Sequence, residues 1–249
     1  MRYWAECGSF FREYRRHIRA TGSLLPSSRF LAGALVSELR KARKPSHILE
    51  VGPGTGSVTR QLVRYLLPGD RVDAVEINGQ FVSLLKRRFE QEWAFRSREG
   101  QLRVIHAAVE DLPGEATYDF IISGLPLNNF PAAQVREIFK AYNRLLKPGG
   151  TLTYYEYVFI RQVMTPFVNR RERRRLYRVG RVVSSYIRSY QVRKQPIFIN
   201  VPPAIVRTLS LKPATAVIDR LAPHQRKVRA PRRTASKPGA RGKSPVRAK

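Results

Sequence analysis

Short apolar runs alternate along this chain with longer stretches in which apolar residues recur every three or four positions. The short runs predict strands and the longer stretches predict helices. Strands are expected at residues 47–51, 71–77, 102–106, 118–123 and 151–160, and helices at residues 57–67, 79–92 and 132–146. Lys147-Pro148-Gly149-Gly150 is expected to end the last helix and form a turn. This alternation predicts a parallel sheet with helices on both faces.

The pattern changes after residue 160. Two β-rich stretches, residues 195–200 and 204–211, are separated by Val201-Pro202-Pro203, and we expect them to pair antiparallel and complete the sheet. The whole is an α/β, Rossmann-like fold whose seven-stranded sheet is mostly parallel with one antiparallel strand. Residues 161–194 form a basic helical insertion with an apolar face of Leu176, Val179, Val183, Ile187 and Tyr190, and with Arg170, Arg174, Arg178 and Arg181 opposite.

Residues 1–20 predict an amphipathic helix. On a helical wheel its aromatic face contains Trp4, Phe10, Phe11 and Tyr14, and its other sector contains Arg12, Arg15, Arg16 and Arg19. Aromatic rings beside arginines suit the headgroup boundary of an anionic membrane. A lid helix that packs its aromatic face on the core is the alternative. On the first interpretation Trp4, Phe10, Phe11, Tyr14 and Arg15 contact the membrane.

The charge of the chain indicates a polyanionic partner. The 249 residues include 47 Lys and Arg but 18 Asp and Glu, for a net charge of +29. Residues 212–249 predict a disordered basic tail, because they combine positive charge with Pro, Gly, Ala and Ser. The phosphates that this tail would bind can belong to an anionic membrane surface or to nucleic acid, and composition leaves both open. Neither a membrane span nor a signal peptide is expected, and a single cysteine fits the reducing cytoplasm.

A glycine-rich turn follows the first predicted strand. The sequence Glu50-Val51-Gly52-Pro53-Gly54-Thr55-Gly56 has glycine at alternate positions, where a ligand can touch bare backbone amides. Glu76 ends the second strand, and its carboxylate can accept two ribose hydroxyls. Dinucleotide-binding proteins have G-x-G-x-x-G instead, with their third glycine where this chain has Ser57. The sequence thus predicts a nucleoside-binding turn.

This turn resembles motif I of the class I S-adenosylmethionine-dependent methyltransferases, in which the turn holds the carboxypropyl end of the cofactor. Over residues 21–211 the chain more closely resembles the bacterial phospholipid N-methyltransferases, which convert phosphatidylethanolamine to phosphatidylcholine. Besides the glycine turn, the resemblance rests on segments beginning at Thr21 (TGSLLPSSR), Ser123 (SGLPL), Tyr154 (YYEY) and Asn200 (NVPPA). It implies S-adenosyl-L-methionine as cofactor, S-adenosyl-L-homocysteine as product, successive methylation and a peripheral place on the inner face of the cell membrane.

The resemblance also assigns roles to residues. Glu50, Gly52, Gly54 and Gly56 would line the methionine end of the cofactor, Glu76 its ribose, and Glu110 and Asp111 its adenine. Ser123, Gly124 and Leu125 would place the lipid amine. Candidates for proton removal or for binding the methylated ammonium are Tyr155 with Tyr157 on one side of the strand, and Tyr154 with Glu156 on the other. Arg161, Arg170 and Arg171 are candidates for the lipid phosphate. No metal is implied.

Two alternatives remain at this point. Ribosomal RNA adenine dimethyltransferases have a similar fold and a reason to be basic, but they carry an aromatic residue, for stacking on the base, where this chain has Leu127. A basic binding protein built on a degenerate methyltransferase scaffold is the other. The intact glycine turn and Glu76 favour an enzyme.

Overall fold

A computed structural model describes residues 29–158, 170–200 and 203–212, without the side chains of residues 171 and 172. The predicted helix at residues 1–20, Arg161 and the predicted tail beyond residue 212 lie outside this part of the chain. The helices are α2 (Arg29–Leu35), α3 (Ser57–Leu62), α4 (Gly79–Gln91), α5 (Trp93–Arg96), α6 (Ala132–Leu145) and α8 (Arg170–Tyr190). The strands are β1 (His47–Val51), β2 (Arg71–Glu76), β3 (Leu102–His106), β4 (Tyr118–Ser123), β5 (Leu146–Tyr157), β6 (Gln191–Ile197) and β7 (Ala204–Leu209). Short 3-10 helices are η1 (Leu39–Lys41), η2 (Val63–Tyr65), η3 (Val109–Asp111) and η4 (Leu127–Asn129).

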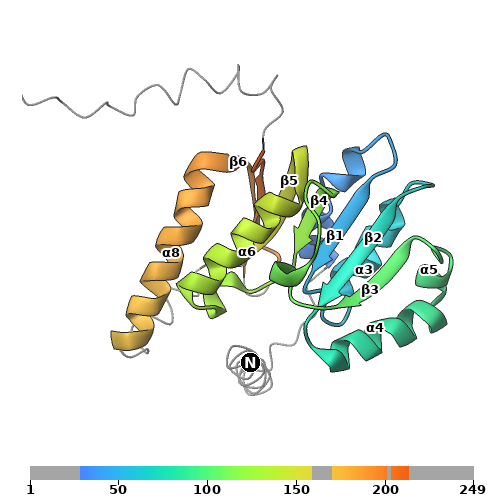
Figure 1. Cartoon of the computed structure of the whole chain (residues 1–249), viewed down its shortest axis with the longest axis horizontal. Coiled ribbons are helices and arrows are strands. Elements are labelled where there is room, and N and C mark those ends of the chain that lie inside the picture. The colour runs from blue at the N-terminus through green and yellow to red at the C-terminus, as the bar shows by residue number, and fades with distance from the viewer. Residues whose placement is uncertain (1–28, 159–169, 201–202, 213–249) are drawn as a thin grey trace, which may run out of the picture. The chain divides into compact units, whose positions relative to one another are not determined.

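The seven strands form one sheet in the order β3-β2-β1-β4-β5-β7-β6 (Figure 1). The pairs from β3 to β5 are parallel, whereas β7 runs antiparallel to both β5 and β6. The predicted fold class, including its one antiparallel strand, is confirmed. Because β1, β2 and β4 are parallel, their carboxyl ends meet at one edge of the sheet. The strand order switches direction between β1 and β4, and such sheets bind ligands at that point.

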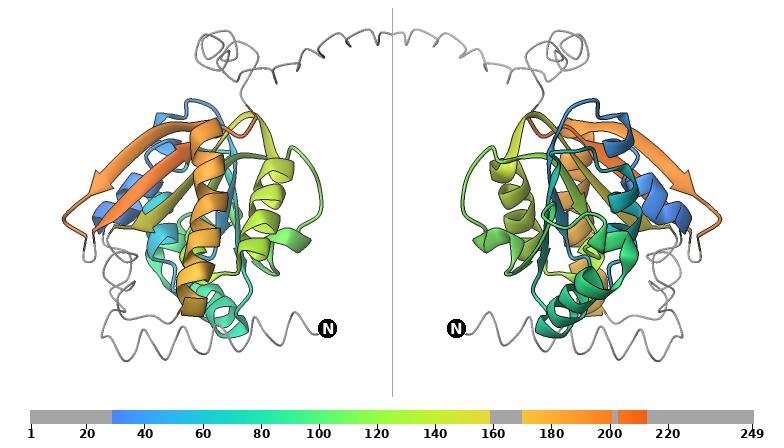
Figure 2. Two further views of the ribbon diagram at one scale, coloured as in Figure 1. Left: turned by 90° about the vertical axis from the view of Figure 1, so that its left-hand side faces the viewer. Right: turned by 90° about the vertical axis from the view of Figure 1, so that its right-hand side faces the viewer.

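Helices cover the sheet on two faces (Figure 2). On one face, residues such as Leu49 and Ile121 pack against Phe139 of α6 and Val179 of α8. On the other, Ile48 packs in a second core with Leu35 of α2. Adjacent residues of β1 thus serve opposite cores, as the alternation of a strand requires. Within the described ranges, no helix is both long and apolar enough to pass through a membrane.

The predicted amphipathic pattern of the insertion appears in α8. Val179 and Val183 are buried, and Arg170, Arg174, Arg178 and Arg181 are exposed. The helix ends at Tyr190 and β6 begins at Gln191, earlier than the predicted strand at residue 195. The outer strand β6 exposes Val192, Lys194 and Pro196. An exposed lysine and an exposed proline are typical of an edge strand, because both hinder pairing with another chain.

Two further predicted boundaries are wrong. Lys147-Pro148-Gly149-Gly150 lies within β5 rather than forming a separate turn, because Leu146 already pairs with Tyr118. The register then shifts before Phe120 pairs with Thr151, and the Gly149 amide donates to the Lys212 carbonyl at 2.7 Å. The helix expected at residues 57–67 is shorter, since α3 ends at Leu62 and continues as the 3-10 turn η2.

Candidate functional site

The glycine turn, the end of β2 and the end of β4 meet at the carboxyl edge of the sheet. Val51 pairs with Val75 on one side and with Ser123 on the other. The Gly52 amide donates to the Val75 carbonyl at 2.9 Å, and the Gly124 amide donates to the Val51 carbonyl at 2.8 Å. The three segments that the sequence predicted to act together are therefore adjacent.

The turn between β1 and α3 depends on left-handed backbone. Gly52, Gly54 and Gly56 have φ angles of +68°, +57° and +83°. Side chains disfavour these values, so glycine is needed for the chain to enter α3 at Ser57. A Cβ at Gly56 would also lie 2.9 Å from Leu85 Cδ2. The result is a turn that presents its backbone without side chains.

Glu76 is a buried carboxylate that is directed at this turn. It is 3% exposed; one oxygen accepts the Gly54 amide at 3.1 Å and the other accepts the Asn78 amide at 2.8 Å. Burial raises the pKa of Glu76, and the amide hydrogen bonds oppose that rise. Each carboxylate oxygen keeps a second lone pair, so Glu76 can accept two further hydroxyl donors.

Glu50 is more unusual because its buried charge is not balanced. The residue is 1% exposed, and neither carboxylate oxygen makes a hydrogen bond of normal geometry within the described residues. Burial raises the pKa of Glu50 to about 7; the nearby Thr59 opposes this rise and the charge of Glu76 adds to it. An unpaired buried carboxylate beside a glycine turn fits a cationic ligand group.

This pKa predicts how stability depends on pH in the absence of ligand. Because the pKa of Glu50 rises from 4.5 in the unfolded chain to about 7 in the folded one, folding takes up a proton between these values. The contribution of Glu50 to stability is therefore retained below pH 4.5 and lost as pH rises through about 7. Glu50→Gln should become more stable than the parent by roughly 3 kcal/mol at about pH 8 and not at about pH 4.5.

Urea unfolding at several pH values measures this difference. Glu99→Gln, at an exposed position after α5, is the matched control and should follow the pH profile of the parent. Parallel pH profiles for Glu50→Gln and the parent would show that Glu50 keeps an ordinary pKa in the folded protein.

A hollow beside Glu76 shows which residues could contact a nucleoside. It is lined by polar groups at Glu76, Glu110 and Gln134 and by apolar residues that include Ala107, Val109, Phe130 and Ile138. Burial raises the pKa of Glu110, and the charge of Asp111 adds to this effect. Asp111 itself is exposed and does not line the hollow. Of the two predicted adenine contacts, Glu110 has the better position.

The loop after β4 packs tightly on the glycine turn. A Cβ at Gly124 would lie 2.7 Å from the Gly52 carbonyl oxygen, and one at Gly52 would lie 2.6 Å from Leu125 Cδ2. Ser123 is fully buried; its hydroxyl accepts a hydrogen bond from Tyr142 at 2.8 Å and from the Leu125 amide at 3.3 Å. The Ser123 side chain thus fixes the loop, and Gly124 and Leu125 lie against the turn.

The tyrosines of β5 separate as their alternation predicts. Tyr155 and Tyr157 meet edge to face with ring centroids 5.1 Å apart. On the other face, the Tyr154 hydroxyl donates to Glu156 at 3.3 Å, and Glu156 also pairs with Arg207 at 3.3 Å. Burial raises the pKa of Tyr157, with a hydrogen bond from Tyr155 acting in the opposite direction. The structure brings each pair together at the carboxyl end of β5.

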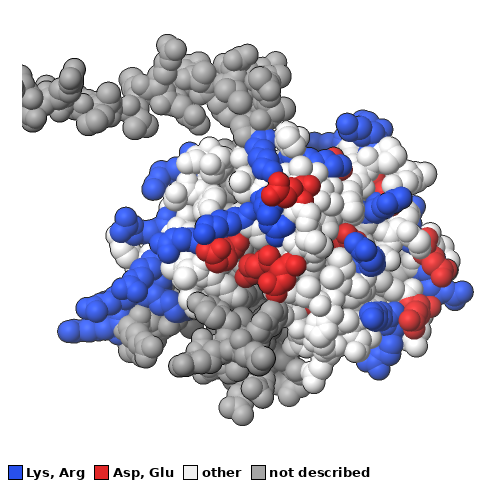
Figure 3. Space-filling model, in the orientation of Figure 1, with Lys and Arg blue, Asp and Glu red and all other residues white. Residues whose placement is uncertain are grey.

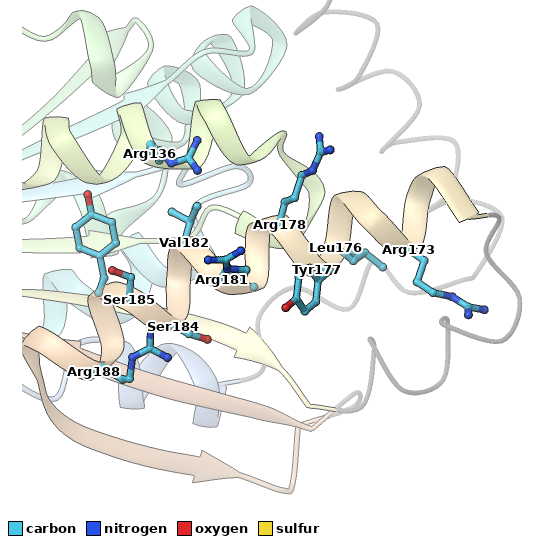
Figure 4. A pocket seen from close by; sticks show the side chains of 12 residues that line it. Arg136, Arg173, Leu176, Tyr177, Arg178, Arg181, Val182, Ser184, Ser185 and Arg188 are labelled. Carbon is cyan, nitrogen blue, oxygen red and sulfur yellow. The ribbon is translucent and has the colours of Figure 1, made fainter. Parts of the chain in front are cut away.

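Arginines concentrate on α8, where Figure 3 shows basic side chains over the left of the molecule. An open groove of about 1060 Å³ runs along α8 and reaches Arg136 of α6 (Figure 4). Its arginines are Arg136, Arg173, Arg178, Arg181 and Arg188. Arg170 is exposed at the start of α8, and Arg171 follows it in the helix. Arg170 does not line the groove, and the side chain of Arg171, like the whole of Arg161, lies outside the described part of the chain.

Sequence reasoning missed several residues that shape this edge. Tyr142 of α6 holds Ser123, and Arg175 of α8 donates to the carbonyls of Asn128 at 2.8 Å and Phe130 at 3.1 Å. Phe130 and Gln134 line the hollow. The apolar face of α6 made the burial of Tyr142 predictable from the sequence. Nothing in the sequence indicated that its partner would be Ser123 of β4.

Comparisons with known proteins identify the domain. The family described as "Methyltransferase domain" matches residues 48–150. The ornithine lipid N-methyltransferase of Singulisphaera acidiphila is 32% identical over 144 residues, which are 57% of this chain and 73% of that protein. Ribosomal RNA small subunit methyltransferase A of a Synechococcus strain is 40% identical over 70 residues, 28% of this chain and 24% of that protein.

A solved structure supports the same fold. The 1,6-didemethyltoxoflavin-N1-methyltransferase of Burkholderia thailandensis, with bound 1,6-didemethyltoxoflavin and S-adenosylhomocysteine, has a TM-score of 0.54. It is 17% identical, and the match covers 82% of this chain and 88% of that one. The similarity extends well beyond the glycine turn.

Proposed function

Because the chain belongs to the class I S-adenosylmethionine-dependent methyltransferases, we propose that it methylates the amine nitrogen of a membrane lipid. Phosphatidylethanolamine is the proposed acceptor, methylated successively toward phosphatidylcholine at the inner face of the cell membrane. The similarity to an ornithine lipid N-methyltransferase over 73% of that protein carries the proposal. That relative acts, by its name, on a lipid nitrogen. The segments that resemble phospholipid N-methyltransferases favour phosphatidylethanolamine.

The residues of the turn fit S-adenosylmethionine, the cofactor of this family. Glu50 offers an unpartnered buried carboxylate to a cation, and Glu76 offers free lone pairs to ribose hydroxyls. Glu110 lines the hollow beside Glu76 and suits the adenine. When bound, the cofactor supplies a methyl group on a positively charged sulfur. The chain must hold the acceptor amine in line and free of its proton.

The end of β5 supplies groups for the acceptor. A phenol with a raised pKa keeps its proton at neutral pH, so Tyr157 suits binding through its ring better than it suits removing a proton. The paired rings of Tyr155 and Tyr157 can attract a methylated ammonium, which has few or no hydrogen-bond donors. Glu156 can accept a proton through a carboxylate that Tyr154 and Arg207 orient. The two pairs lie on opposite faces of β5, so only one of them can face the acceptor: either the tyrosine pair binds the methylated ammonium, or Glu156 accepts the proton.

Transfer of labelled methyl groups to vesicles tests the acceptor. The protein is mixed with labelled cofactor and with vesicles of phosphatidylethanolamine, of ornithine lipid, or with ribosomal RNA. We expect labelled mono-, di- and trimethylated phosphatidylethanolamine. Label in ornithine lipid alone would move the proposal to that lipid, and label in neither lipid, with cofactor bound, would overturn it.

Ribosomal RNA adenine methylation is the second candidate, because a 70-residue stretch is 40% identical to a ribosomal RNA methyltransferase. Leu127 counts against it. The residue stands where an aromatic side chain would stack on the base, and it is aliphatic and 3% exposed within the core. Label in the RNA fraction would favour this candidate.

A further inference from the structure

Two large apolar side chains project from the turn between β6 and β7. Phe198 is 72% exposed and Ile199 is 71% exposed. Asn200, which follows, is 4% exposed, so the turn is anchored directly behind them. We call Phe198 and Ile199 the apex. Leaving two adjacent apolar side chains in water is unfavourable, and an exposed pair of this kind indicates a contact surface.

The apex lies at the same edge of the sheet as the proposed site. Ile197 pairs with Ala204, and Ala204 pairs with Tyr157 at the end of β5. Further along the same strands, Lys194 is level with Tyr154, which pairs with Ser123. Strand β6 therefore extends beyond the level of Ser123, and the apex lies past the start of the loop after β4.

The basic half of α8 lies at this edge too. Helix α8 ends where β6 begins, at the opposite edge, and its first residues therefore lie toward the same edge as the apex, although separated from it (Figure 4). Arg173, Arg174 and Arg178 are exposed there, and Tyr177 beside them is 68% exposed. The edge thus combines a cluster of positive charge with apolar and aromatic side chains.

We propose that the apex inserts into the apolar boundary of an anionic bilayer while the arginines of α8 contact lipid phosphates. This inference rests on the proposed lipid substrate and adds the surface through which the protein would approach it. Charge complementarity favours a membrane, since arginines attract anionic headgroups and two adjacent apolar side chains gain from leaving water. RNA would use the arginines but offers no apolar layer to Ile199.

A fluorescent label reports whether the apex enters lipid. In a Cys7→Ser background, which removes the single cysteine, a polarity-sensitive dye is attached in Ile199→Cys. Vesicles of phosphatidylglycerol and phosphatidylethanolamine should shift its emission to the blue. Val192→Cys is the matched control: Val192 is 53% exposed on the same strand but near the opposite edge, and its label should not shift.

Co-sedimentation with the same vesicles measures the contribution of the apex. Phe198→Ser with Ile199→Ser should weaken vesicle binding about tenfold or more, whereas Val192→Ser should not. Arg173→Gln with Arg178→Gln should weaken binding in a salt-dependent way, and Arg87→Gln on the exposed face of α4 should not.

Failure of this inference is separate from failure of the proposed function. Lipid methylation with an unshifted label at position 199, and with undiminished binding of the apex variant, overturns the inference alone. Insertion of the apex without lipid methylation would support the docking surface and overturn the proposed lipid substrate. Displacement of the protein from vesicles by RNA, with no shift of the label, overturns the inference in favour of a nucleic-acid surface.

Discussion

Glu76→Ala should weaken binding of S-adenosylmethionine about a hundredfold. The carboxylate is buried at the end of β2 and can accept two ribose hydroxyls, and hydrogen bonds to a charged acceptor contribute about 1.5–3 kcal/mol each. Two such bonds contribute about 3–6 kcal/mol, so a hundredfold loss is the low end of this range. The substitution also leaves the amides of Gly54 and Asn78 without their acceptor. Isothermal titration calorimetry gives the affinity directly.

Two further variants make this measurement specific. Glu76→Gln keeps the shape but not the charge, and we expect it to fall between the parent and Glu76→Ala. Glu90→Ala removes an exposed carboxylate of α4 and should bind as the parent does. Parental affinity in a folded Glu76→Ala protein would mean that the ribose lies elsewhere.

Gly124→Ala should slow methyl transfer about a hundredfold and reduce stability by about 1–3 kcal/mol. The added Cβ would lie 2.7 Å from the carbonyl oxygen of Gly52, and the neighbour is backbone that cannot rotate away. The acceptor loop and the glycine turn must then separate. A displacement of about 1 Å at a reacting centre can cost a hundredfold in rate. Thermal unfolding and a methylation assay record the two effects.

Gly33→Ala is the matched control for this change. Gly33 lies in α2, and its nearest neighbour to an added Cβ is Gln61 Nε2 at 3.8 Å, an ordinary contact. This variant should retain activity and gain slight stability, because alanine favours the helix. Full activity in Gly124→Ala would show that the two loops tolerate separation.

Much of the fold could be predicted because local patterns decide it. Strands β1, β3 and β4 have the predicted bounds, since each is a short apolar run that ends in a turn. The segment Lys147–Gly150 misled the prediction. Its proline and glycines are typical of a turn, but pairing of Leu146 with Tyr118 draws it into β5. Tertiary contacts here override local preference.

The site was predictable where one segment determines it. The glycine turn and Glu76 follow from their places at the ends of strands, and the structure brings them within hydrogen-bond distance. The partnership of Ser123 with Tyr142 joins residues from different elements, and so does the hold of Arg175 on the loop after β4. Neither contact produces a periodic pattern or a fixed spacing in the sequence, so neither could be predicted from the sequence alone.

The outer strand of the sheet limits how copies of this protein can associate when they are crowded together. Strand β6 lies at the border of the sheet and exposes Lys194 and Pro196, and proline has no amide hydrogen to donate. A second copy that approached this border would meet a charge and an interrupted row of donors. Many copies can therefore share a small area without growing into fibrils from this strand.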